Sequence, residues 1–155
     1  MTTDSTNIVG GGGEASETPL LRKIEESNPF PLSASLELTN RCNLSCPHCY
    51  IPEKREGNEL ATAAVYEIID QLAENGTIWL GLTGGEPCLR EDLVEIVRYA
   101  SNKRFCVSMT SNATLIDGGV ARKLFEAGLS KLSASIYHIT PSLHDGFVGL
   151  QGAWE

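Results

Sequence analysis

The 155-residue sequence has few basic residues and no long apolar run. Lys and Arg number 12 against 20 Asp and Glu, which leaves a net charge of -8. Nucleic acids and anionic membranes are bound through clustered cations, so this balance argues against both as partners. No stretch of about 18 apolar residues is present, and the N-terminal "MTTDSTNIVGGGGEASETP" lacks the basic start and apolar centre of a secretory signal. We therefore expect a cytoplasmic protein.

Cysteine is scarce as well, and its placement is uneven. Of the five cysteines, Cys42, Cys46 and Cys49 fall inside the short stretch "TNRCNLSCPHCY". An odd count and such tight spacing do not suit a disulfide framework, so they favour a reducing compartment. Cys106 lies in an apolar run and is expected in the core, whereas Cys88 follows a glycine-rich turn and is expected to pack beside it.

The N-terminal residues 1–32 are predicted to be a flexible tail and a lead-in. Thr, Ser, Gly and Glu dominate the first 19 residues, which include a run of four glycines and cannot bury enough apolar area to fold. "LLRKIEES" predicts a short helical turn, which the Asn28-Pro29 and Phe30-Pro31 pairs end by forcing extended backbone. Residues 33–155 are of the usual size for one domain.

From residue 33 onward, short apolar runs alternate with stretches of helical spacing. This order is typical of repeated βα units around a parallel sheet, so we predict an α/β fold. The second run, "TIWLGL", is continuously apolar, which predicts a central strand covered on both faces. The four strands are expected at residues 33–38, 77–82, 105–110 and 131–136.

Three predicted helices separate these strands, each with an apolar stripe expected to face the core. The stripes are Val65/Ile68/Ile69/Leu72, Leu93/Ile96/Val97/Ala100 and Val120/Ala121/Leu124/Phe125. Asn75-Gly76 and Gly128 are placed as C-terminal caps of the first and third helices, and Asp117 as the N-cap of the third. Trp79 and Trp154 are interpreted as core or docking aromatics.

In parallel βα folds the active site is built from the loops that leave the carboxyl ends of the strands. The four predicted loops carry the residues that are candidates for a functional site. We therefore expect these residues to lie at one edge of the sheet. The loops are "TNRCNLSCPHCY", "TGGEP", "SNATL" and "YHITPSLHD".

Two kinds of metal site fit the cysteine loop, besides the possibility of untethered core cysteines. A structural zinc ion would need His48 as its fourth ligand, yet His48 is adjacent to Cys49, and no second pair of ligands follows at the usual distance. An iron-sulfur cluster of four irons offers one ligand site per iron, so three thiolates would leave one iron open. An open coordination position is characteristic of a reactive metal site.

The spacing C-x3-C-x2-C directly after a strand, followed by an aromatic residue, resembles the signature of the radical S-adenosylmethionine (radical SAM) superfamily. The resemblance implies a 4Fe-4S cluster on Cys42, Cys46 and Cys49. It also implies that the open iron binds the amino and carboxylate groups of the methionine half of S-adenosylmethionine. The expected fold is then a partial (β/α) barrel of which this chain holds the N-terminal four βα units.

The glycine turn after the second strand resembles the second motif of that family. Gly84, Gly85, Glu86 and Pro87 form "GGEP", and the resemblance implies that its backbone and Glu86 contact the methionine amino group. Without the cysteine loop, we would interpret the same residues as an ordinary glycine-rich turn.

The two later loops add weaker resemblances. "TSNATL" is similar to the family's TNG-like turn, in which Ser111 and Asn112 would reach the methionyl carboxylate or the sugar, although Asn is also a routine turn residue. Ser135 would lie near the ribose.

The stretch "SIYHITPSLHD", residues 135–145, is similar to the pattern S-I-Y-G-x-T-P-x-x-H-D and is closest to the peptide- or cofactor-maturing, SPASM-type members. His138 stands where that pattern has Gly. Tyr137, His144 and Asp145 are expected to fix the loop rather than to act as an acid-base group.

The resemblance implies a radical enzyme that cleaves S-adenosylmethionine to a 5'-deoxyadenosyl radical, with an external electron donor and a peptide or small-molecule substrate. It spans about residues 36–155, and the family's core has about six βα units. We therefore expect a core domain that is incomplete at its C-terminus, ending where a fourth helix would begin, and a possible complementing polypeptide. The alternatives are a truncated, catalytically incomplete cluster-binding fragment and a zinc-stabilised interaction module.

Overall fold

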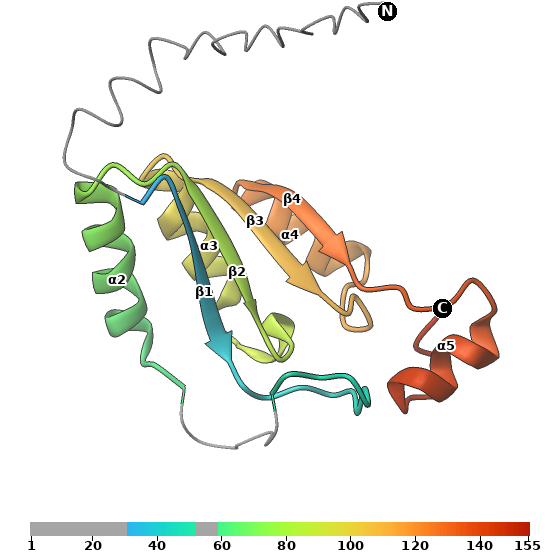
Figure 1. The fold of residues 1–155 in the computed structure, drawn as a ribbon. Helices are drawn as coiled ribbons and strands as arrows, with labels where there is room; N and C mark the ends of the chain where they lie inside the picture. The colour runs from blue at the N-terminus through green and yellow to red at the C-terminus, as the bar shows by residue number, and fades with distance from the viewer. Residues whose placement is uncertain (1–30, 52–58) are drawn as a thin grey trace, which may run out of the picture.

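The computed structural model describes residues 31–51 and 59–155, and the predicted tail and the helical turn at residues 20–27 lie outside them. Four parallel strands form one sheet in the order β1-β2-β3-β4 (Figure 1). They are β1 (Ser33–Thr39), β2 (Trp79–Gly84), β3 (Cys106–Ser111) and β4 (Leu129–Ala134). The α/β prediction is confirmed, with β2, β3 and β4 displaced from their predicted bounds by one or two residues.

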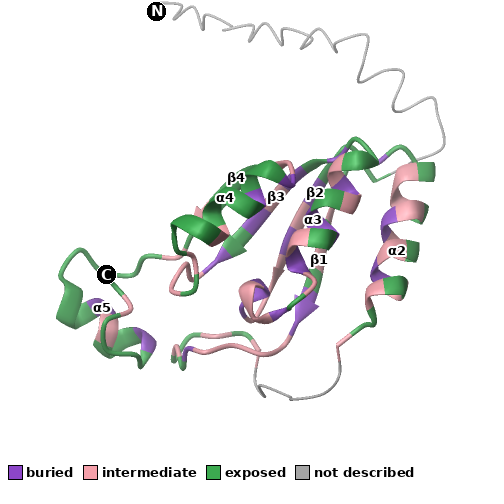
Figure 2. Cartoon of the chain, turned by 180° about the vertical axis from the view of Figure 1, so that it is seen from behind, coloured by how far each residue is buried: buried purple, intermediate pink, exposed green. Residues whose placement is uncertain are grey.

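The three predicted helices all pack on one face of this sheet (Figures 1 and 2). They are α2 (Thr62–Glu74), α3 (Leu93–Asn102) and α4 (Gly118–Glu126), and a 3-10 turn, η1 (Pro87–Leu89), precedes α3. The predicted caps are confirmed: Asp117 accepts a hydrogen bond from the Val120 amide at 2.7 Å, and Gly76 and Gly128 have positive φ.

The helix-covered face carries the aliphatic core. Parallel register places Leu36, Leu82, Met109 and Leu132 in one row across the sheet. Leu82 and Met109, in the two central strands, are 1% exposed, and the helices add Ile69, Ile96 and Leu124 above them. The three helices bury their apolar stripes against this row. This is why apolar residues recur at helical spacing in the sequence.

The opposite face, here called the open face, has no helix over it in the part of the chain that the structure describes. One of its rows joins Ser35, Gly81, Ser108 and Lys131. The prediction that β2 is covered on both faces is therefore wrong: Trp79 is 51% exposed on this side. The apolar run "TIWLGL" gave the wrong prediction because Gly81, a small residue within it, occupies an uncovered position on the sheet.

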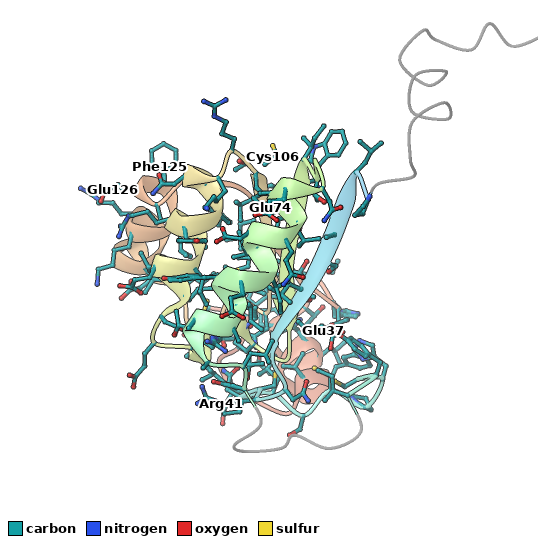
Figure 3. The ribbon with its side chains drawn as sticks, turned by 90° about the vertical axis from the view of Figure 1, so that its left-hand side faces the viewer. Glu37, Arg41, Glu74, Cys106, Phe125 and Glu126 are labelled. Carbon is teal, nitrogen blue, oxygen red and sulfur yellow. The ribbon has the colours of Figure 1, made fainter. Side chains whose placement is uncertain are left out.

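Three further core predictions are wrong, those for Cys106, Ala121 and Phe125, and Ala121 is exposed on the surface of α4. Cys106 is exposed because it begins β3 opposite Trp79 on the open face. Phe125 is 78% exposed because its neighbour Leu124 takes the buried position on α4, and Figure 3 shows Phe125 at the outer surface of the helix layer.

The segment after β4 is not a loop throughout. It contains a helix, α5 (Pro141–Val148), with Pro at its first turn and Gly149 in the left-handed conformation at its end. α5 lies beside the cysteine loop rather than on the sheet (Figure 1). None of the helices in the described residues is long and apolar enough to cross a membrane.

Candidate functional site

The carboxyl ends of the strands meet at one edge, as the loop rule predicts, and enclose a cavity of about 180 Å³. All four strand-end loops contribute to its wall. The predicted site residues on the wall are Cys42, Cys46, Cys49, Gly84, Gly85, Ser111, Asn112 and Ser135. The other two, Glu86 and Pro87, are fully buried in the protein.

The cysteine loop presents its thiols to this cavity. Cys42 Sγ accepts hydrogen bonds from the Leu44 amide at 3.4 Å and from Asn112 Nδ2 at 3.9 Å, and the Cys49 amide donates to the Cys46 carbonyl at 3.2 Å. These hydrogen bonds orient the Cys42 side chain and set the turn between Cys46 and Cys49. Three soft sulfur ligands on one wall suit an iron-sulfur cluster by ligand chemistry. Among the described residues, no three His, Cys, Asp or Glu side chains are grouped around a single-ion position.

The two glycines of "GGEP" are required by the approach of the cysteine loop. The Gly85 amide donates to the Thr39 carbonyl at 2.7 Å, and the Glu86 amide donates to the Arg41 carbonyl at 2.8 Å. A Cβ at Gly84 would lie 2.3 Å from the Thr39 carbonyl oxygen, and one at Gly85 would lie 2.1 Å from that of Arg41. The backbone of this turn is thus locked to the start of the cysteine loop while it lines the cavity.

The carboxylate of Glu86 is turned into the protein. It is 0% exposed and accepts hydrogen bonds from the Cys88 amide at 3.0 Å, Ser111 Oγ at 2.8 Å and the Asn112 amide at 2.8 Å. The three donors satisfy both oxygens of this buried side chain. Glu86 therefore joins the loop after β2 to the loop after β3, and it is the backbone of Gly84 and Gly85 that faces the cavity.

Asn112 builds the turn after β3 and also lines the cavity. Its Oδ1 accepts from the Thr114 amide at 3.0 Å, and its Nδ2 donates to Asn43 Oδ1 in the cysteine loop at 2.9 Å. Ala113, between Asn112 and Thr114, has φ of +63°, a left-handed conformation that glycine adopts more readily than a residue with a Cβ.

The tip of the cysteine loop is held by α5. The Ser45 amide donates to the Val148 carbonyl at 2.8 Å. The His48 ring stacks on Phe147, with centroids 5.1 Å apart, and meets Tyr137 edge-on at 4.7 Å. The residue that a zinc site would recruit therefore takes part in an aromatic stack.

Two residues of α5 have positioning contacts of the kind expected from the sequence. His144 is buried and accepts a hydrogen bond from the Tyr137 amide at 3.3 Å through Nδ1. Asp145 accepts from the Gly152 amide at 2.7 Å and from the Trp154 amide at 3.1 Å. Trp154 in turn meets the His144 ring edge-on at 5.5 Å. These contacts fold residues 137–154 onto themselves.

Cys88 is not a candidate ligand. It packs against the core cluster, as the sequence indicated. Burial, followed by the nearby Glu86 carboxylate, raises the pKa of its thiol to about 12, so it stays protonated at neutral pH.

Sequence reasoning missed Thr83 and Thr110, which also line the cavity. Both occupy open-face positions near the carboxyl ends of their strands, where Thr83 pairs with Glu37 and Thr110 pairs with Ser133. Their signal was the alternation of apolar and hydroxyl side chains in "WLGLTG" and "CVSMTS", which places hydroxyls on one face.

Comparison with known proteins connects this geometry to a family. The family profile described as "Radical SAM superfamily" matches residues 36–149. An AdoMet-dependent heme synthase of Oleidesulfovibrio alaskensis is 35% identical over 148 residues, 94% of this chain and 38% of the relative. A PqqA peptide cyclase of Bradyrhizobium diazoefficiens is 34% identical over 134 residues, 85% of this chain and 35% of the relative. An Fe-coproporphyrin III synthase of Methanosarcina barkeri is 41% identical over 120 residues, 76% of this chain and 30% of the relative.

Solved structures share the fold at low sequence identity. Streptococcus suis SuiB bound to precursor peptide SuiA aligns with a TM-score of 0.73 at 18% identity, covering 97% of this chain and 36% of that chain. BtrN in complex with AdoMet and 2-DOIA aligns with a TM-score of 0.63 at 20% identity, covering 74% of this chain and 48% of that chain. The chain spans about a third of the length of the curated relatives it matches.

Proposed function

Because this chain belongs to the radical SAM superfamily, we propose that it binds a 4Fe-4S cluster and S-adenosylmethionine and serves in radical generation. One observation carries the proposal: the thiols of Cys42, Cys46 and Cys49 line a cavity to which all four strand ends contribute. When bound, the reduced cluster supplies one electron to the sulfonium of S-adenosylmethionine, which yields methionine and a 5'-deoxyadenosyl radical that abstracts hydrogen from a substrate. We place this core domain at residues 33–155.

The chain's own contribution to cluster binding is three thiolates and their orientation. The Leu44 amide and the Asn112 side chain donate to Cys42 Sγ, and the hydrogen bond between Cys49 and Cys46 sets the turn between these two ligands. Because three cysteines of the described residues line the cavity, one iron of the proposed cluster would be left for S-adenosylmethionine.

For S-adenosylmethionine we propose contacts from the backbone of Gly84 and Gly85 and from the side chains of Ser111, Asn112 and Ser135. Their common presence on the cavity wall supports this assignment. Glu86 is proposed to act on S-adenosylmethionine binding indirectly, because its buried carboxylate holds Ser111 and the Asn112 amide in place. Pro87, the last residue of the motif, begins the η1 turn.

We propose that the substrate lies over the open face, next to the cavity. Its positions carry Glu37, Thr83, Ser108, Thr110 and Lys131, which offer hydrogen bonds rather than the branched apolar side chains that fill a packed barrel. This lining suits a polar substrate, either a peptide or a cofactor precursor. Named relatives include a PqqA peptide cyclase and heme synthases. An external electron donor and a complementing polypeptide are the partners proposed.

The test is anaerobic reconstitution with iron and sulfide, followed by dithionite reduction with S-adenosylmethionine and chromatography for 5'-deoxyadenosine. We expect about four irons per chain, 5'-deoxyadenosine as product, and loss of both in Cys42→Ala. Cys106→Ala is the matched control, because Cys106 is exposed at the opposite end of the strands from Arg41 and the cysteine loop (Figure 3). Stoichiometric zinc without iron would contradict the proposal.

A further inference from the structure

A cluster of four charged side chains lies at the base of the cysteine loop. We call it the basal clasp, and it consists of Arg41, Glu59, Arg90 and Asp92. The Arg90 side chain at its centre is 4% exposed, whereas the other three are between 23% and 37% exposed. None of the four lines the cavity, so the site described above does not account for them.

Arg90 holds three segments of the chain together. Its Nη1 donates to the Leu38 carbonyl at the end of β1 and to the Leu60 carbonyl ahead of α2, each at 3.0 Å. Its Nε and Nη2 donate to the two oxygens of Asp92 at 2.8 and 2.6 Å. This pairing satisfies a guanidinium whose burial would otherwise be costly.

Glu59 completes the clasp at the start of the cysteine loop. Its carboxylate forms a bidentate salt bridge with Arg41, whose Nε and Nη2 donate to it at 2.6 and 3.2 Å. It also accepts a hydrogen bond from Thr39 Oγ1. Arg90 Nη1 lies 3.9 Å from its second oxygen. Arg41 additionally donates to the Leu89 carbonyl at 2.9 Å, which reaches the turn after "GGEP".

These contacts join Thr39 and Arg41, which precede the three cysteines, to Glu59, which follows them. They also join both to residues 89 and 90, just beyond the glycine turn. The ligand loop and the turn that lines the same cavity thus share one charged anchor. Such second-layer support determines how accurately the groups of a site are held.

We propose that Arg41 and Glu59 are positioning residues, which set the cysteine loop in register with the Gly84–Gly85 backbone before any metal arrives. Two amides report on this register directly, because the Gly85 amide donates to the Thr39 carbonyl and the Glu86 amide to the Arg41 carbonyl. The consequence for S-adenosylmethionine rests on the proposed function, whereas the ordering of the loop does not.

Hydrogen exchange of the metal-free chain tests the ordering. In Glu59→Gln, which removes the charge at nearly constant shape, we expect the Gly85 and Glu86 amides to exchange about tenfold faster or more. Amides of β3 should keep their wild-type rates, which separates loosening of the clasp from loss of the whole fold. Glu59→Asp, which keeps the charge, should recover part of the protection.

Asp70→Asn is the matched control. Asp70 pairs with Lys103 at 2.6 Å between α2 and the end of α3, away from the cysteine loop. Unchanged exchange at Gly85 and Glu86 in Glu59→Gln, or equal acceleration in Asp70→Asn, would overturn the proposal. If Glu59→Gln does not fold, Arg41→Lys takes its place in the same experiment, because it keeps the positive charge but loses the bidentate salt bridge.

A second measurement separates positioning from simple stability. After loading with iron and sulfide, the reduced cluster is titrated with S-adenosylmethionine and followed by electron paramagnetic resonance. We expect wild-type iron content in Glu59→Gln, but about fivefold more S-adenosylmethionine at half-saturation. An unchanged requirement overturns the coupling. Absence of iron in the wild-type chain refutes the proposed function and leaves the exchange result standing.

Discussion

The two faces of the sheet use the same four strands in opposite ways. Toward the helices, one row reads Leu36, Leu82, Met109 and Leu132, and toward the open face the adjacent row reads Ser35, Gly81, Ser108 and Lys131. Alternation along a strand is what allows one residue to serve the core and the next to serve a ligand. A residue of the core and a residue of the face proposed for the substrate are thereby adjacent along the chain.

The largest expected difference between the faces is between Met109 and Thr110. Met109→Ala should lower the free energy of unfolding by about 2 to 5 kcal/mol, because it removes a side chain that is 1% exposed in the core. Thr110→Ala, one residue further on the exposed face, should change it by less than about 0.5 kcal/mol. Urea denaturation followed by circular dichroism measures both. Similar losses in the two variants would show that the open face is packed.

The edge where the cysteine loop meets the glycine turn should be the next most sensitive position. Gly85→Ala places a Cβ 2.1 Å from the Arg41 carbonyl oxygen, so we expect a loss of about 1 to 3 kcal/mol together with reduced iron retention. Gly118→Ala is the control, since a Cβ there meets no atom within 4 Å. Thermal unfolding and iron analysis test the pair, and wild-type behaviour of Gly85→Ala would contradict the close approach.

A smaller gain is expected in the turn after β3. Ala113→Gly should raise stability by about 1 kcal/mol, because it removes a left-handed conformation at φ of +63° from a residue with a Cβ. The gain is limited by the extra freedom of glycine in the unfolded chain. Denaturant unfolding measures it, and a decrease in stability would show that the Ala113 methyl has a packing role.

The smallest effect expected is the pH dependence of the basal clasp. Hydrogen bonds from Arg41 hold the pKa of Glu59 below its ordinary value of 4.5, and those from Arg90 hold the pKa of Asp92 below 3.8. Carboxyls with lowered pKa values contribute stability above their unfolded pKa values and lose it as the pH falls through the folded ones. The clasp should therefore be intact at pH 6 to 8 and loosen only in acid. Unfolding free energies measured from pH 7 to pH 3 should fall less steeply in Glu59→Gln than in the wild type.

Local patterns were sufficient for the four strands, for α2, α3 and α4 and for the eight predicted residues of the cavity wall, but not for α5. Helical stripes, the Asp117 cap and the glycines at positions 76 and 128 act within a few residues, so they could be placed without tertiary information. The cysteine spacing and the rule that loops gather at the carboxyl ends of parallel strands likewise brought Cys42, Gly84 and Asn112 to one cavity.

Neighbours along the chain were enough to predict the four strands, α2 to α4, their caps and the three cysteines proposed as ligands. Tertiary contacts set the exposure of Cys106, the inward orientation of Glu86, the contact of α5 with the cysteine loop and the pairing of Glu59 with Arg41, 18 positions away. These outcomes depend on which face a helix covers and on which distant segments meet. Burial and charge pairing are set by such contacts and leave no periodic signal in the sequence.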